Sequence, residues 1–218
     1  MRITAINGSP KTKGSTSEQI VKQMERILGE EICLYHVRHL TQDTSVCESE
    51  ALGMSCEALL DTDVLLIVFP LYVDGIPAHL IELLTRLEVA TRDMSVAPHI
   101  YAVANCGLYE PEHAALALDM IGHFAKRAGL TWGCGLGIGG GGMLSSMGSD
   151  WSKGPASSVD AALRTLVDAM REGESLQHAF VVPRFPRFLY IAAANMGWHL
   201  QARRSGAQKR MKAQPYLE

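Results

Sequence analysis

The sequence lacks most features that mark membrane, secreted or nucleic-acid-binding proteins. No uncharged apolar run reaches the roughly 18 residues that a membrane span requires. The N-terminus has no basic segment followed by an apolar one, so we expect no secretory signal. The five cysteines are an odd, scattered set, which argues against a disulfide framework and favours a reducing cytoplasm. A net charge of −3 gives no reason to expect nucleic acid as a partner.

The chain does have enough apolar residues for a substantial core, because 47% of its 218 residues are hydrophobic. Apolar runs of strand length recur at residues 3–6, 31–37, 64–69, 99–104 and 130–138. Segments with helical spacing lie between and after them, at residues 17–28, 48–60, 77–90, 110–128 and 155–170. In residues 110–128 the apolar positions that we note are Leu116, Met120 and Phe124. Strand–helix alternation with continuously apolar strands predicts an α/β fold, a doubly wound five-stranded parallel sheet over residues 1–174.

After residue 174 the pattern changes to an appended arm, residues 175–218. This arm carries seven Arg or Lys residues and one acidic residue, so its charge is +6 while the preceding residues carry −9. We expect a basic arm with one apolar helix that packs on the domain or on a second subunit. Basic amphipathic segments can also bind membrane surfaces, so contact of the arm with a membrane surface is an alternative, which we favour less.

In open parallel sheets, ligands bind at the carboxyl ends of the strands. The loop after the first strand, "NGSPKTKGSTSE", is neither a Walker A loop nor a Gly-x-Gly-x-x-Gly loop. Its serine and threonine hydroxyls lead into a helix, and hydroxyls with backbone N–H groups at a helix start suit a phosphate, with help from Lys11 or Lys13. An ordinary turn that caps the helix explains the same residues equally well.

Three further loops should meet the same edge of the sheet. The loop after the third strand, "FPLYVDGIPAHL", contains two stiffening prolines, and Tyr72 offers a planar face that could brace a flat ring. Asn105, Cys106 and Gly107 end the fourth strand, and we favour a small packing role for Cys106 over that of a nucleophile activated by His113. The run Gly139–Gly142 after the fifth strand predicts close approach to a ligand or a movable lid.

Together these loops resemble the flavodoxin-like NAD(P)H-dependent FMN reductase family, over roughly residues 1–174. The resemblance implies that the first loop holds the FMN phosphate, that the third loop borders the flavin ring, and that the fourth loop touches the ring. The matching first-loop residues are Ser9, Lys11, Gly14, Ser15, Thr16 and Ser17. Those of the third loop are Pro70, Leu71, Tyr72, Val73, Asp74, Gly75 and Pro77. Those of the fourth loop are Asn105, Cys106 and Gly107.

The sequence departs from the branch that it resembles most, the iron–sulfur flavoproteins. Those proteins carry a compact cysteine cluster between the second and third strands, where this chain has only Cys47 and Cys56. A cubane cluster normally needs four thiolates, so we expect no iron–sulfur centre and no other metal. Phe69 also stands where the family usually has a serine before the proline.

The resemblance implies an enzyme that takes electrons from NADH or NADPH into bound FMN and passes them to a small acceptor. A quinone, an azo or nitro compound, or free flavin could be this acceptor. The flavin carries the chemistry, so we nominate no catalytic side chain. Enzymes of this kind are often oligomeric, and we expect a homodimer or a homotetramer. The alternatives are a flavodoxin-type carrier that binds FMN without oxidising NAD(P)H, and a degenerate domain that scaffolds or senses.

Overall fold

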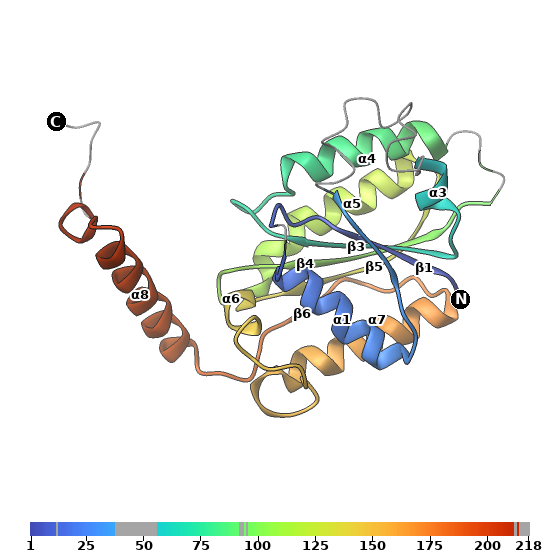
Figure 1. The fold of residues 1–218 in the computed structure, drawn as a ribbon. Helices are drawn as coiled ribbons and strands as arrows, with labels where there is room; N and C mark the ends of the chain where they lie inside the picture. Colours follow the sequence, from blue (N-terminus) through green and yellow to red (C-terminus); the bar gives the residue numbers. More distant parts are fainter. Residues whose placement is uncertain (12, 38–55, 92–93, 95, 212, 214–218) are drawn as a thin grey trace. The chain divides into compact units, whose positions relative to one another are not determined.

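The computed structural model describes residues 1–11, 13–37, 56–91, 94, 96–211 and 213. The chain forms two compact units, Met1–Arg184 and Phe185–Glu218. The first unit is a three-layered α/β domain, with helices on both faces of a central sheet (Figure 1). The predicted α/β architecture with a parallel sheet is therefore confirmed.

The sheet has six strands within the described residues rather than the predicted five. They are β1 (Ile3–Asn7), β2 (Cys33–His36), β3 (Val64–Pro70), β4 (His99–Asn105), β5 (Thr131–Ile138) and β6 (Ala179–Val181). All pair in parallel, in the order β2-β1-β3-β4-β5-β6. The additional strand β6 places Ala179 beside Leu136 and Val181 beside Ile138. The sheet thus extends beyond residue 174. Strand β6 has only three residues, which is too short a run to be predicted from the apolar pattern.

Helices cover the two faces of the sheet unequally. On one face lie α1 (Thr16–Leu28) and α7 (Ser157–Glu172). On the other lie α3 (Cys56–Leu60), α4 (Ala78–Ala90) and α5 (Ala115–Arg127), as Figure 1 shows. Short helices within the described residues lie at the loops: η2 (Pro111–Ala114), α6 (Gly141–Leu144) and η3 (Gly154–Ala156).

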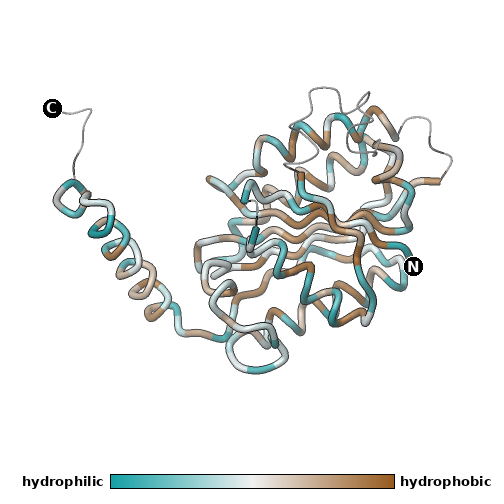
Figure 2. The backbone as a smooth tube through the Cα atoms, viewed as in Figure 1, coloured by the Kyte–Doolittle hydropathy of each residue, from teal (hydrophilic) through white to brown (hydrophobic). Residues whose placement is uncertain are grey.

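Strand β3 supplies both hydrophobic cores because consecutive side chains of a strand face opposite ways. Leu65, Ile67 and Phe69 pack in the core beneath α4 and α5, and Leu66 and Val68 pack in the core beneath α1 and α7. All five are fully buried, and burial of a side chain of this size contributes roughly 1.5–3 kcal/mol. Figure 2 shows the hydrophobic colour concentrated along the strands in the middle of the domain.

Local sequence signals set the ends of the helices. Ser15 caps α1 by accepting a hydrogen bond from the backbone N–H of Glu18, and Gly29 ends the helix with a φ of 74°. Pro77 directly precedes α4. Of the helix predicted at residues 48–60, only Cys56–Leu60 is described, and the rest lies outside the described residues.

The second unit contains α8 (Arg187–Arg204) and η4 (Gln208–Arg210). No residue of α8 is buried, and its Phe188 and Trp198 are 70% and 65% exposed. Large apolar side chains that are exposed on a helix are typical of a surface that packs against another one. The predicted division between functional domains after residue 174 stays a prediction. Among the described residues, no helix combines the length and the apolar character needed to cross a bilayer.

Candidate functional site

The candidate site lies where β1, β3 and β4 end. The chain connects β1 to β2 on one side and continues to β3 on the other, so the strand order reverses at β1. This switch point is where open α/β sheets bind ligands. The first loop, residues 7–15, leaves β1 here and enters α1.

Asn7, the last residue of β1, organises the first loop although its own side chain is fully buried. Its Nδ2 donates to Ser15 Oγ (3.0 Å) and to His36 Nδ1 (3.2 Å), and its Oδ1 accepts the backbone N–H of Ser9 (2.9 Å). One side chain therefore joins both ends of the loop to the end of β2. The sequence analysis missed Asn7 and His36. A polar residue that ends a buried strand was a readable signal for Asn7, but β2 is only partly buried and gave no such signal for His36.

Three buried hydroxyls of the first loop and of α1 keep a proton to donate. Ser15 Oγ accepts from Asn7 and from the backbone of Glu18, and Ser17 Oγ accepts from Asn105 Nδ2 (3.1 Å). Ser9 Oγ accepts the backbone N–H of Lys11 (3.3 Å). Within the described part of the chain no group accepts a hydrogen bond from these hydroxyls. The backbone N–H groups of Thr16 and Ser17 open the helix and likewise have no acceptor there.

This donor set fits an oxyanion such as a phosphate monoester. Lys11 is exposed beside it, as is Gly14, which has a φ of 65° and donates its N–H to Glu18 Oε2 (3.0 Å). Glu18 bonds to both Gly14 and Lys22, and these bonds, the one from Lys22 first, lower the pKa of its carboxyl. The negative charge of Glu18 is thereby compensated by Lys22 and Gly14, close to the start of α1.

The third loop is fastened directly to the first. His79, in the first turn of α4, donates from Nε2 to the carbonyl of Gly8 (3.0 Å). The backbone N–H of Gly8 donates to the carbonyl of Val68 (2.8 Å). A Cβ on Gly8 would come within 2.8 Å of both Leu80 Cδ2 and Phe69 Cβ, so only glycine lets the two loops approach this closely. His79 was not predicted, and its position in an ordinary helix start gave no signal.

The tip of the third loop, Tyr72–Gly75, is a tight turn exposed to solvent. Tyr72 and Gly75 exchange two backbone hydrogen bonds (3.1 and 3.0 Å), and the central residues Val73 and Asp74 have φ values of 50° and 55°. A left-handed β-branched residue is strained, and strain of this kind concentrates at functional sites. Val73 is fully exposed and Tyr72 is 47% exposed. The backbone N–H groups of Val73 and Asp74 have no acceptor among the described residues.

Asn105, at the end of β4, bridges the loops from below. Its Nδ2 donates to Ser17 Oγ (3.1 Å) and to the carbonyl of Phe69 (3.2 Å), and its carbonyl accepts the N–H of Leu71 (2.9 Å). Asn105 is 6% exposed, so these bonds form away from water. The structure therefore brings predicted residues of all three loops into one hydrogen-bonded network.

Cys106 packs in the core rather than acting as an activated thiol. It is buried, and its Sγ accepts the N–H of Leu108 (3.3 Å). Burial raises the pKa of the Cys106 thiol, so the thiol stays protonated at neutral pH. His113, in η2, contacts Asp74 instead (Nδ1 to Oδ1, 3.2 Å). This contact connects η2, which follows the fourth loop, to the tip of the third loop. Gly107 is exposed at the same edge.

The glycine run after β5 is held by the fourth loop. The N–H of Gly140 donates to the carbonyl of Leu108 (2.6 Å), and that of Gly141 to the carbonyl of Cys106 (2.7 Å). A Cβ on Gly139 would stand 2.1 Å from the carbonyl oxygen of Tyr109, and one on Gly141 would stand 2.9 Å from the carbonyl oxygen of Cys106. Close packing of backbone on backbone explains these glycines, a structural reason that the sequence analysis did not consider.

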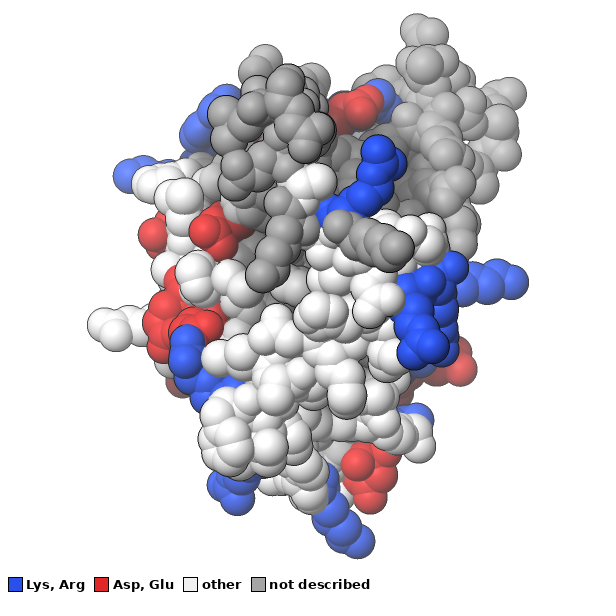
Figure 3. All heavy atoms as spheres, turned by 90° about the vertical axis from the view of Figure 1, so that its left-hand side faces the viewer, with Lys and Arg blue, Asp and Glu red and all other residues white. Residues whose placement is uncertain are grey.

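The electrostatics around this edge are mixed. Figure 3, which looks from the left-hand side of Figure 1, shows Lys and Arg as well as Asp and Glu among many uncharged side chains. Selectivity for an anion must then come from local donors rather than from a field of one sign. In the described ranges, His, Cys, Asp and Glu side chains nowhere gather in threes as a metal site requires.

Comparison with protein families gives a match over residues 1–126, to the family described as NADPH-dependent FMN reductase. The match covers more than half of the chain, and it includes all the predicted residues of the first, third and fourth loops. No curated protein matches the sequence.

Solved structures of similar fold include flavin enzymes and a flavodoxin. An apo NADH:FMN oxidoreductase is 19% identical, with a TM-score of 0.55 over 80% of this chain and 90% of that one. The NAD(P)H:quinone oxidoreductase from Methanothermobacter marburgensis is 16% identical, with a TM-score of 0.55 over 82% and 98%. A Streptococcus pneumoniae TIGR4 flavodoxin is 12% identical, with a TM-score of 0.51 over 79% and 99%. At these identities the similarity establishes the flavodoxin-like fold.

Proposed function

Because the chain belongs to the NADPH-dependent FMN reductase family, we propose that it passes electrons from NADH or NADPH through bound FMN to a small acceptor. Membership makes the chain an NAD(P)H-dependent flavin oxidoreductase in general terms. The acceptor that we propose is a quinone, an azo or nitro compound, or free flavin. FMN supplies the chemistry of accepting a hydride and passing the electrons on.

The observation that carries the proposal is the network that joins the three loops. Asn105 contacts Ser17 of α1 and Leu71 of the third loop, and His79 holds Gly8. A ligand that needs donors from all three loops would find them already fixed in relative position, which lowers the entropy cost of binding it. A phosphate attached to a flat ring is such a ligand.

In this proposal the first loop holds the phosphate. The hydroxyls of Ser9, Ser15 and Ser17 and the N–H groups at the start of α1 donate to it, with Lys11 nearby. The residues assigned to the phosphate are Ser9, Lys11, Gly14, Ser15, Thr16 and Ser17. The N-terminal end of the helix dipole adds to the attraction of an anion.

The third and fourth loops border the ring. Tyr72 presents a half-exposed aromatic face, and the N–H groups of Val73 and Asp74 are donors without an acceptor in the described chain. Donors held at fixed positions stabilise negative charge that develops on a ligand. The residues assigned to the ring are Pro70, Leu71, Tyr72, Val73, Asp74, Gly75, Asn105, Cys106 and Gly107.

Titration of the purified chain with FMN tests the cofactor. We expect yellow protein, or quenching of FMN fluorescence with a dissociation constant below the high micromolar range. The double variant Ser15→Ala/Ser17→Ala should bind FMN at least tenfold more weakly, because two charge-assisted hydrogen bonds are lost. The matched control is Ser157→Ala/Ser158→Ala, which removes two serines from the start of α7 on the same face of the sheet. Equal FMN affinity in wild type and in Ser15→Ala/Ser17→Ala would refute the phosphate assignment.

The alternative is a flavodoxin-type electron carrier that binds FMN but does not oxidise NAD(P)H. Such carriers tend to be strongly acidic, which steers them toward partners. The net charge of −3 and the basic arm favour the enzyme. Stopped-flow mixing of FMN-loaded protein with NADPH decides between them, because only the enzyme bleaches the flavin. A panel of acceptors under steady state then identifies the one used.

We also propose that the protein is a homo-oligomer, a dimer or a tetramer, in which α8 covers an apolar surface of a second copy. Phe188 and Trp198 are largely exposed on a helix without a buried residue. Sedimentation velocity of Phe188→Asp/Trp198→Asp should show a smaller species than wild type. An unchanged sedimentation coefficient would contradict the role of the arm.

Two further expectations stay predictions. We expect no iron–sulfur cluster; Cys47 lies outside the described residues, and Cys56 is buried. Iron and acid-labile sulfide analysis of the purified protein tests this. We also expect the protein to act in the cytoplasm, without nucleic acid as a partner.

A further inference from the structure

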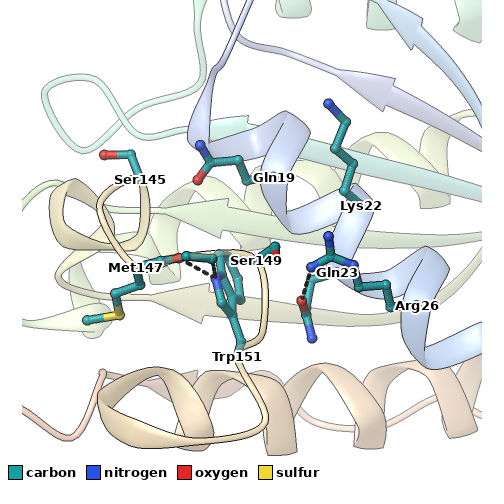
Figure 4. Close-up of a pocket in the computed structure, with 9 residues that line it drawn as sticks. Gln19, Lys22, Gln23, Arg26, Ser145, Met147, Ser149 and Trp151 are labelled. Carbon is teal, nitrogen blue, oxygen red and sulfur yellow. Dashed lines mark hydrogen bonds between the residues drawn. The ribbon is translucent and has the colours of Figure 1, made fainter.

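A groove runs along the side of α1 that faces α7 and the segment after α6. One part of it, with a volume of ≈ 220 Å³, lies between α1 and the segment that follows α6 (Figure 4). An adjoining part, ≈ 350 Å³, reaches α7. The two parts share Gln23, Arg26 and Ser149. Their other lining residues are Gln19, Lys22, Ser145, Met147, Gly148, Trp151, Asp150, Ser152 and Arg164.

A buried polar pair under the groove holds two arginines. Gln23 Nε2 donates to Asp160 Oδ1 (2.7 Å), and both residues are only 4% exposed. Arg164 Nε donates to the other oxygen of Asp160 (2.8 Å), and Arg26 Nη1 donates to Gln23 Oε1 (3.4 Å). Burying a carboxylate and an amide is costly unless both are satisfied. Here each is satisfied by a partner that positions a guanidinium from one of two different helices.

The cations of the groove differ in how far they are neutralised. Lys22 pairs with Glu18 (2.6 Å), and Arg164 pairs with Asp160. Arg26 has no carboxylate within ion-pair distance in the described part of the chain, and the hydrogen bond from its Nη1 goes to the neutral amide of Gln23. Asp150 is the remaining acid of the lining, and its Oδ1 accepts two hydrogen bonds from Ser152. These bonds, with smaller contributions from the charges of Lys153 and Arg26, lower the pKa of its carboxyl. Arg26 therefore keeps a fork of N–H donors and a charge that no carboxylate of the described residues neutralises at ion-pair distance, although Asp150 acts on it from further away. Such a group suits a phosphate.

The groove and the candidate flavin site share one helix. Thr16 opens α1 at the phosphate loop, and Arg26 lies ten residues further on, about 15 Å along the helix axis. The side chain of Arg26 leans back toward the start of the helix, as long side chains of helices do. Gln19, at the near end of the groove, is one turn from Thr16. A dinucleotide with two riboses and two linking phosphates can extend over such a distance.

We propose that this groove binds the adenosine 2′-phosphate end of NADPH, and that Arg26 and Arg164 thereby make the protein prefer NADPH to NADH. The inference rests on the proposed use of a nicotinamide coenzyme and adds a site to it. The 2′-phosphate is the only group that distinguishes the two coenzymes, and it is a dianion at neutral pH. Arg26 meets it with an unpaired charge, and Arg164 adds a second guanidinium from α7.

Calorimetry with adenosine fragments tests the site without any flavin chemistry. The two probes are 2′,5′-ADP and 5′-ADP, which carry the same number of phosphates in different places. We expect wild type to bind 2′,5′-ADP at least tenfold more tightly than 5′-ADP. Arg26→Gln should abolish this preference, because it removes the unpaired guanidinium, and Arg26→Lys should restore part of it, because charge returns without the fork.

The matched control is Arg171→Gln. Arg171 is a cation of the same helix as Arg164, and it binds Asp168 and the carbonyl of Leu28 outside the groove. This variant should keep the wild-type preference. Equal affinity of wild type for the two probes, binding of neither, or an unchanged preference in Arg26→Gln would overturn the inference. Arg164→Lys keeps a cation beside the buried Asp160 and should reduce the preference about threefold to tenfold.

Coenzyme kinetics separate this inference from the proposed function. In Arg26→Gln the KM for NADPH should rise at least tenfold while kcat and the KM for NADH stay as in wild type. A protein whose bound flavin neither coenzyme reduces would refute the proposed function, whereas the fragment test would still stand or fall by itself. Equal rises of KM for both coenzymes would refute the assignment of the 2′-phosphate.

Discussion

The first loop and the tip of the third loop meet the same edge of the sheet, but opposite forces shape them. In the first loop, Asn7 is fully buried and Ser15 is 2% exposed, and side-chain hydrogen bonds fix the backbone. At the third-loop tip Val73 is fully exposed, and two backbone hydrogen bonds hold a turn with positive φ at its centre. One region is fixed by satisfied buried polar groups, and the other stores strain.

The difference indicates a division of labour. A preorganised loop binds a small anion with little entropy cost, which suits a group that is always the same, such as a phosphate. An exposed, strained turn has fewer contacts to lose when it adjusts, which suits the neighbourhood of exchanging substrates. Substitutions should therefore have large effects on stability in the first loop and small ones at the third-loop tip.

The largest effect should come from Asn7→Leu. Leucine has the same number of side-chain heavy atoms and the same branching, but it is larger and leaves Ser15 Oγ, His36 Nδ1 and the N–H of Ser9 without their amide partner. Loss of a buried hydrogen-bonding group costs about 1–3 kcal/mol, and this side chain serves three partners. We expect the free energy of unfolding in urea to fall by about 3 kcal/mol, together with loss of FMN binding.

The control for Asn7→Leu is Tyr72→Leu at the other region. In the described part of the chain the hydrogen bonds of Tyr72 are those of its backbone, and its ring is half-exposed. The free energy of unfolding should therefore change by less than about 0.5 kcal/mol. FMN affinity should nonetheless fall, because an aromatic contact is lost. If the two variants lost equal stability, the contrast between the loops would be wrong.

A pair of glycines gives a second, sharper comparison. Gly8→Ala places Cβ 2.8 Å from Leu80 and Phe69, and overpacking of a core typically costs about 1–3 kcal/mol. Gly75→Ala places Cβ no closer than 3.5 Å to the carbonyl of Tyr72, an ordinary contact. We expect the Tm to fall by several degrees for Gly8→Ala and by about one degree or less for Gly75→Ala. The reverse order would show that the third-loop turn is the more tightly packed of the two.

Local pattern predicted most of the fold because continuously apolar strands and capped helices are local signals. The apolar run at residues 64–69 forms β3, and the helix predicted at residues 17–28 forms with a start only one residue earlier, at Thr16. Pattern was a poor guide to the buried face of α5: Leu116 and Met120 are 62% and 39% exposed, and Ala117, Leu118 and Ile121 face the core instead. Alanine and leucine occur on both sides of this helix, so tertiary packing decides which side is buried.

The site was less readable than the fold. Hydroxyl-rich "GSTS" and "PLYVDGIP" are local motifs, and the network between their loops joins residues that the sequence named. The residues that create this network are remote from one another. Asn7 meets His36, and Gly8 meets His79, only because parallel strands end together. A single sequence does not reveal which polar partners such an edge brings into contact.

Relief of strain is the next prediction, with Val73→Asn at the third-loop tip. Asparagine tolerates left-handed φ far better than a β-branched residue, and the exposed Val73 side chain loses little packing. We expect stabilisation by about 0.5–1 kcal/mol, seen as a rise of a few degrees in Tm. Asp74 also has positive φ, but its contact with His113 makes it the poorer position to change. A lower Tm for Val73→Asn would mean that the turn carries no strain.

The smallest effect should come from Lys22→Gln on α1, and its pH dependence identifies its origin. The bond from Lys22 is the largest cause that lowers the pKa of Glu18, so the contribution of this carboxylate is present above its unfolded pKa and is lost as pH falls through the lower folded pKa. Removing Lys22 should therefore cost about 0.3–0.5 kcal/mol at pH 7 and less at pH 3, measured by urea unfolding at both. Lys22 also lines the groove beside Arg26. Because the expected change in stability is so small, weaker binding of 2′,5′-ADP by the variant would report the loss of a contact with the ligand rather than damage to the fold. A large loss of stability that persists at pH 3 would instead assign Lys22 to the fold.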